Sequence, residues 1–260
     1  MKNFLILLMA FISVSTASVI AADMKFAQVS DAMYSAGNEK SAENLTKIIN
    51  DINKQKNISF VVFTGNNISK PEKKNLEEFL DIAKKLNPPY YVVLGNKDVN
   101  KQKDLGKAEY MKTVGKENRA HRKIESPNYV FEKNGVVFIV VDGSKEVIPS
   151  PIGYYKPDVL KWLDEQLSLN ARKNVVILQH FPLVPPSKKE NRYTYKAAEY
   201  LKLLESHKNV KAVVAGHYNV NNEQTVNGVL HISTENVPAY KIIEIIDYDT
   251  NNPSFWSFCR

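Results

Sequence analysis

Residues 90–99 read YYVVLGNKDV, an apolar run that stops at a glycine and continues in polar residues. Tyr91 to Leu94 have the composition of a buried β-strand, and Gly95 marks its end. Asn96, Lys97 and Asp98 follow at once. Packing alone does not call for three such polar side chains in a row, so this strand end is a candidate functional site.

Four other predicted strands end in the same way. Asp31 follows residues 25–29, and Gly65-Asn66-Asn67 follows residues 58–63. His180 follows residues 174–178, and Gly216-His217 follows residues 210–215. Ligands of open α/β sheets bind beyond the carboxyl ends of the strands. Carboxylate, amide and imidazole groups gathered there predict a site for a metal ion or an anion.

The remaining pattern alternates strands with amphipathic helices. Helices are predicted at residues 42–52, with Ser41 as N-cap, and at 70–86, 157–169 and 195–206. Further strands are predicted at 129–132 and 136–141, which flank a KNG turn, and at 225–226, 229–232 and 240–246. This order predicts an α/β fold in a single domain, with helices outside apolar sheets.

The first 22 residues have the pattern of a cleaved signal peptide. Lys2 precedes an apolar run from residue 4 to residue 12, and small residues follow up to Ala22. The run is too short for a membrane-spanning helix, and no second apolar segment is long enough for one. An uncleaved anchor is the alternative. We therefore predict a signal peptide at 1–22, a domain at 23–260, and a secreted or periplasmic location.

The composition bounds the possible functions. The 260 residues are 43% apolar and 24% charged, with a net charge of +7, which is typical of a globular protein. Residues 97–123 hold nine basic and four acidic side chains. These residues either form a solvent-exposed face or attract an anionic substrate. No nucleic-acid motif is present, so DNA or RNA is not an expected partner. The single cysteine, Cys259, excludes an internal disulfide and is interpreted as an inert thiol in a frayed tail.

The strand-end motifs resemble those of a known family. Their order is Asp31, Gly65-Asn66, Gly95-Asn96-x-Asp98, His180-x-Pro182 and Gly216-His217-x-Asn219. This order is similar to that of the calcineurin-like metallophosphoesterase superfamily, and the HFP at 180–182 is nearest to its purple-acid-phosphatase-like branch. The resemblance covers residues 24 to about 247. It implies a four-layer α/β/β/α sandwich of two mixed sheets flanked by helices, and a phosphoester as substrate.

The metal-binding motifs of the family are incomplete in this chain. Members of the family hold a first metal with an Asp, a His two residues later, a Gly-Asp carboxylate and a final His. Those positions are Asp31, Met33, Asn66 and Asn219 here, and a thioether and neutral amides are weak ligands for such ions. The second metal would use Asn66, Asn96, His180 and His217. The resemblance therefore implies either one divalent ion (Zn, Mn or Fe) or none.

Lys97 replaces a histidine of the family beside the leaving group. It is either a surface lysine with no role or has one of two functional roles. It either stabilises a phosphate or donates a proton, with Asp98 as a second catalytic candidate, or its charge replaces a missing ion by pairing with Asp31 or Asp98. Asn67 and Tyr218 are candidates for substrate binding. We expect an exported phosphoesterase-family protein with weak or single-metal activity at best. The alternative is a non-catalytic pseudoenzyme that binds an anion or a partner through the same crevice.

Overall fold

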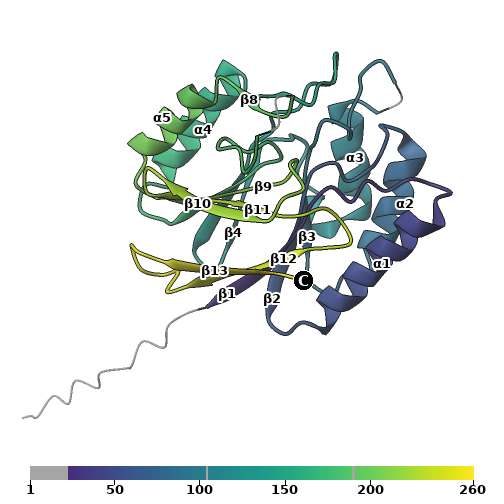
Figure 1. Ribbon diagram of the computed structural model, residues 1–260, viewed down its shortest axis with the longest axis horizontal. Helices are drawn as coiled ribbons and strands as arrows, with labels where there is room; N and C mark the ends of the chain where they lie inside the picture. The colour runs from purple at the N-terminus through teal and green to yellow at the C-terminus, as the bar shows by residue number, and fades with distance from the viewer. Residues whose placement is uncertain (1–22, 104, 189–190) are drawn as a thin grey trace, which may run out of the picture.

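The computed structural model describes residues 23–103, 105–188 and 191–260. The predicted signal peptide at 1–22 lies outside this part of the chain. Two β-sheets pack face to face, with helices α1, α2 and α3 on one side and α4 and α5 on the other (Figure 1). The predicted α/β/β/α sandwich is therefore confirmed.

Both sheets are mixed, as predicted. The first has the order β13-β12-β1-β2-β3, in which β1, β2 and β3 are parallel. Its strands are β1 (Met24–Val29), β2 (Ile58–Thr64), β3 (Tyr90–Val93), β12 (Lys241–Ile246) and β13 (Ser254–Cys259). The second has the order β10-β11-β9-β7-β5-β4, with parallel strands in its middle. Its strands are β4 (Tyr129–Lys133), β5 (Val136–Val140), β7 (Val175–Leu178), β9 (Val210–Ala215), β10 (Asn222–Val226) and β11 (Val229–Ser233).

Helices connect the parallel strands and cover the outer faces of the sheets. They are α1 (Glu39–Lys54), α2 (Lys73–Ala83), α3 (Lys107–Glu117), α4 (Pro157–Leu169) and α5 (Ala197–Ser206). A short 3-10 helix, η1 (Arg119–His121), follows α3, and a small sheet pairs β6 (Gly153–Tyr154) with β8 (Thr194–Tyr195). Helix α1 buries Leu45, Ile48, Ile49 and Ile52, the spacing on which it was predicted.

Four details differ from the sequence prediction. The N-cap of α1 is Asn38, whose side chain accepts a hydrogen bond from the Ser41 amide, so the predicted cap at Ser41 is wrong. Helix α3 forms inside the basic segment, where no helix was predicted. Strand β13 pairs Cys259 with Lys241 of β12, so the predicted frayed tail is wrong as well. The small β6–β8 sheet was not predicted either.

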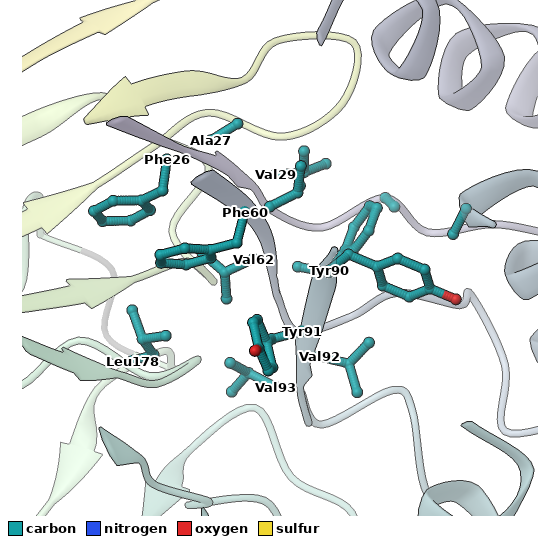
Figure 2. Close-up of a cluster of buried hydrophobic side chains, with 14 of the residues drawn as sticks. Phe26, Ala27, Val29, Phe60, Val62, Tyr90, Tyr91, Val92, Val93 and Leu178 are labelled. Carbon is teal, nitrogen blue, oxygen red and sulfur yellow. The ribbon is translucent and has the colours of Figure 1, made fainter. Parts of the chain in front are cut away.

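An aromatic layer joins the two sheets. Phe26 and Phe60 of the first sheet stack on each other (Figure 2), and their ring centroids are 4.8 Å apart. Phe138 of the second sheet meets Phe60 edge-on at 4.8 Å. All three rings are fully buried. This layer fixes the separation of the sheets and therefore the relative positions of their strand ends.

No helix in the described part of the chain is long and apolar enough to cross a bilayer.

Candidate functional site

The carboxyl ends of β1, β2, β7 and β9 meet at one edge of the sandwich. The Gln28 side chain of β1 donates to the carbonyl of Ala215 in β9 at 2.7 Å. Gly216 follows β9, and a Cβ atom there would lie 2.0 Å from the Ser30 hydroxyl. Only glycine permits this approach. The two sheets are thus joined at the edge where the sequence predicted a site.

Asp31 is the best-connected side chain of this edge. Its Oδ2 accepts hydrogen bonds from the Ser30 hydroxyl at 2.6 Å and from the His217 amide at 2.9 Å. Its Oδ1 accepts one from the side-chain amide of Asn66 at 2.9 Å. Only 4% of the residue is exposed. Both carboxylate oxygens are therefore already engaged by protein donors.

Asn66 occupies the position at which a carboxylate would be needed to bridge two metal ions. Its Nδ2 donates to Asp31, and its Oδ1 accepts from the Lys97 backbone amide at 2.9 Å. A cation cannot share an oxygen with an amide hydrogen that points at the same lone pair. These residues do not fit a centre of two metal ions, because a proton donor replaces the negative charge that would hold the ions together.

His180 and His217 face each other through ring nitrogens. His180 Nε2 lies 3.1 Å from His217 Nδ1. The other nitrogens point at backbone carbonyls, with His180 Nδ1 2.7 Å from the Thr64 oxygen and His217 Nε2 2.8 Å from the Pro151 oxygen. Burial lowers the pKa of His180 to about 4 and that of His217 to about 3. Both rings are therefore neutral at neutral pH.

The rings of His180 and His217 carry one N–H hydrogen too few for their three contacts. Each of the three contacts needs one N–H hydrogen, and two neutral imidazoles supply two. If both carbonyls receive a hydrogen, the facing nitrogens both carry lone pairs. Two nitrogen ligands of one tetrahedral zinc ion lie about 3.3 Å apart, given Zn–N bonds of about 2.0–2.1 Å. Anchoring of the rear nitrogen on a carbonyl is also the usual support of a metal-binding histidine. This pair fits a single divalent ion.

Further ligands for such an ion would have to be amide oxygens or water. No three His, Cys, Asp or Glu side chains among the described residues are grouped to hold a metal. Asn96 Oδ1 and Asn219 Oδ1 are buried acceptors with no hydrogen-bond partner. Both residues were predicted as ligands, and these unsatisfied oxygens are available for that role.

Asp98 is buried beneath the loop that carries Asn96 and Lys97. Its carboxylate accepts from the backbone amides of Gly95 at 2.7 Å and Ile68 at 3.0 Å. Burial raises its pKa to about 7. Asn67 is also buried and donates to the Val93 carbonyl at 3.0 Å. Asp98 and Asn67 hold the loop in place through these contacts. The catalytic role predicted for Asp98 and the substrate-binding role predicted for Asn67 stay predictions.

Lys97 has an exposed side chain at the surface of the site. It makes no ion pair with Asp31 or Asp98, since both carboxylates accept from other donors and the ion pairs between described residues do not include it. The hypothesis that its charge pairs with either carboxylate in place of an ion is therefore wrong. Its free ammonium group remains available to an anionic ligand.

Tyr218 is buried against His217, with ring centroids 5.8 Å apart. A substrate contact by Tyr218 stays a prediction, because only 1% of the residue is exposed. Met33 is half-buried, and its amide donates to the Asn66 carbonyl at 2.9 Å. The site also contains unusual backbone geometry, with positive φ at Asp31, Met33, Asn66, His217 and Asn219. Such strain is typical of functional sites.

The sequence prediction missed Arg192. Its guanidinium donates to the His217 carbonyl at 2.8 Å, and the residue is half-buried. It comes from the long polar connection between β7 and α5, where no periodic pattern singles out one side chain. Arg192 adds a permanent positive charge beside the two neutral histidines.

Comparisons with known proteins agree with this fold. Residues 24–220 match the family model described as calcineurin-like phosphoesterase. A dimetal phosphatase from Danio rerio is 17% identical, with a TM-score of 0.67 over 90% of this chain and 98% of that one. TT1561 of Thermus thermophilus is 14% identical, with a TM-score of 0.62 over 90% and 99%.

A third similar structure is described as GAP50, the anchor in the inner membrane complex of Plasmodium. It is 16% identical, with a TM-score of 0.60 over 86% of this chain and 83% of that one. At these identities the likeness shows the fold alone. A comparison with curated proteins gave no match. The closer relation to purple acid phosphatases stays a prediction.

Proposed function

Because the chain belongs to the calcineurin-like phosphoesterase family, we propose that its crevice binds a phosphoester and holds one divalent ion in place of two. The observation that carries this proposal is the hydrogen bond from the Asn66 amide to Asp31 Oδ1. It removes the charge on which a second ion would depend. Hydrolysis is then slow or absent, since the two-ion clamp on the attacking and leaving oxygens is not available.

His180, His217 and the oxygens of Asn96 and Asn219 would hold the ion, which could be Zn, Mn or Fe. When bound, it would polarise a phosphoryl oxygen. Arg192 and Lys97 supply positive charge for the remaining phosphate oxygens. Asp98 and Asn67 keep the Lys97 loop in position from beneath.

The test combines metal content with hydrolysis of p-nitrophenyl phosphate. We expect about one ion per chain and a rate near background with added Mn²⁺. A rate that increases with a second bound ion would refute the proposal. His180→Ala should lose the ion, and Lys202→Ala, an exposed position on α5, is the control.

A non-catalytic binding protein is the second candidate. The same Asn66–Asp31 contact favours it, because that contact keeps the carboxylate satisfied without metal. The similarity to GAP50, which is described as an anchor, is compatible with it. Stabilisation by inorganic phosphate in the presence of a chelator would favour this candidate, and stabilisation that requires metal would count against it.

We also propose that the protein is exported after cleavage of residues 1–22. The basic start, the apolar run and the small residues before Asp23 support this. N-terminal sequencing of protein from the producing cells should begin at residue 22 or 23. A start at Met1 would contradict it.

A further inference from the structure

A basic pocket lies beside the proposed phosphoester site. It has a volume of about 270 Å³, and Lys70, Lys97 and Lys103 line it. None of the described residues that form its wall carries an acidic side chain. It adjoins the site through two contacts. The carbonyl of Pro151 in its wall lies 2.8 Å from His217 Nε2, and the Lys97 amide donates to Asn66. Three lysines close together produce a local positive potential.

An apolar loop tip stands on the rim of this pocket. Val147 is 55% exposed and Ile148 is 76% exposed, and the next residue, Pro149, is part of the pocket wall. Scattered apolar residues on a surface are ordinary. Two consecutive branched side chains next to a pocket of lysines are a different arrangement, since they make the surface amphipathic.

The loop that carries this tip is fastened on both sides. The Lys101 amide donates to the Glu146 carbonyl at 2.7 Å. The Glu146 carboxylate accepts from the Lys107 amide at 2.8 Å, so this nearby acidic group is engaged away from the pocket. At the other end, the Pro151 carbonyl contacts His217. The fold therefore holds Val147 and Ile148 outward, and burial within the protein does not account for them.

We propose that this surface binds membranes that contain anionic phospholipids. A lipid phosphate group lies among Lys70, Lys97 and Lys103, and Val147 and Ile148 enter the boundary between headgroups and acyl chains. Peripheral proteins bind by this combination of apolar insertion and attraction to anionic lipid. The inference goes beyond the proposed function and needs neither a bound metal ion nor hydrolysis.

The test is co-sedimentation of the purified protein with lipid vesicles at low salt. We expect binding to phosphatidylcholine vesicles that contain about one fifth phosphatidylglycerol, weaker binding to phosphatidylcholine alone, and a steep loss of binding as salt increases. Lys70→Ala and Lys103→Ala should each reduce the partition coefficient about fivefold. The double variant Val147→Ser with Ile148→Ser should reduce it by about tenfold or more.

Matched controls use exposed residues on the far helices. Leu169→Ser removes an apolar side chain that is 77% exposed at the end of α4, and Lys202→Ala removes an exposed lysine on α5. Neither should change vesicle binding. Equal losses in the controls would overturn the proposal.

Two other outcomes would also overturn it. Absence of binding to anionic vesicles would do so directly. Binding that inorganic phosphate abolishes, and that the Val147 and Ile148 variant leaves intact, would assign the pocket to a soluble anion. Neither outcome affects the single-ion proposal, because metal content and hydrolysis report on His180 and Asp31 separately.

Discussion

Replacement of Asn66 by Asp is the most informative single change to the site. It restores a carboxylate 2.9 Å from Asp31 Oδ1 while keeping an oxygen that can accept from the Lys97 amide. Asp also tolerates the left-handed backbone at this position, where φ is 51°. The only major change is that a donor becomes a second negative charge in a buried site.

The size of the effect follows from the contact. Two unit charges about 2.9 Å apart repel by roughly 6 kcal/mol at an effective dielectric constant of about 20. The pair avoids this cost when it binds one proton. Protonation of a carboxyl at pH 7 requires roughly 4 kcal/mol, since the pKa of a free carboxyl is about 3.9. Asn66→Asp should therefore reduce the free energy of unfolding by about 4 kcal/mol at pH 7.

The pH dependence is the sharpest part of this prediction. The shared proton raises the apparent pKa of the pair in the folded state, so the loss should vanish as the pH falls towards 4 and grow as the pH rises. Urea unfolding in the presence of a chelator, at pH 4 to 8, measures it. Divalent metal should restore stability at pH 7. Asn66→Gly, which removes the donor without adding charge, is the control and should lack this pH dependence.

A different result would refute the described contact. If Asn66→Asp were as stable as the wild type at pH 7 in chelator, the two side chains could not be neighbours in a buried site. If it were destabilised equally at pH 4 and pH 7, the cause would be packing and not charge.

Three further changes test other parts of the structure. Lys97→Ala should alter the free energy of unfolding by less than about 0.5 kcal/mol, because its side chain is exposed, and should weaken stabilisation by phosphate in a thermal shift assay. His121 is fully buried, and its Nε2 accepts from the Val92 amide at 3.1 Å. Burial lowers its pKa to about 3, below the unfolded value, so stability is lost as the pH falls below 6.5. Between pH 6.5 and pH 4 the free energy of unfolding, measured in urea titrations, should fall by about 3 kcal/mol less in His121→Gln than in the wild type. An equal fall in both proteins would contradict this. Phe60→Ala should reduce the free energy of unfolding by about 3–5 kcal/mol and Phe60→Leu should reduce it less, because the ring fills the layer between the sheets. Equal urea midpoints for the wild type and the two variants would contradict that.

The strand ends were predictable because their physical signal is local. A buried parallel strand is a continuous apolar run, and the change to Gly, Asn, Asp or His marks where it leaves the core. That signal placed Asp31, Asn66, His180 and His217, which the fold brings together. Helix α3 was hidden because its lysines obscured the short apolar spacing of Tyr110, Met111 and Val114.

The roles of side chains were less predictable than their positions. Asn96, Lys97 and Asp98 are consecutive, yet Asp98 points inward to backbone amides and Lys97 points to solvent. The direction of each side chain depends on the turn geometry and not on the residue types. Arg192 reaches the site from a connection without periodicity, so only the tertiary structure could identify it.

The number of metal ions bound by each chain distinguishes a one-ion site from a two-ion site. Protein purified without chelator, then loaded with excess Zn²⁺ or Mn²⁺ and freed of unbound metal, is measured by elemental analysis for wild type, His180→Ala and Asn66→Asp. We expect one ion in the wild type, none in His180→Ala and an additional ion in Asn66→Asp. Two ions in the wild type, or none after loading, would contradict it.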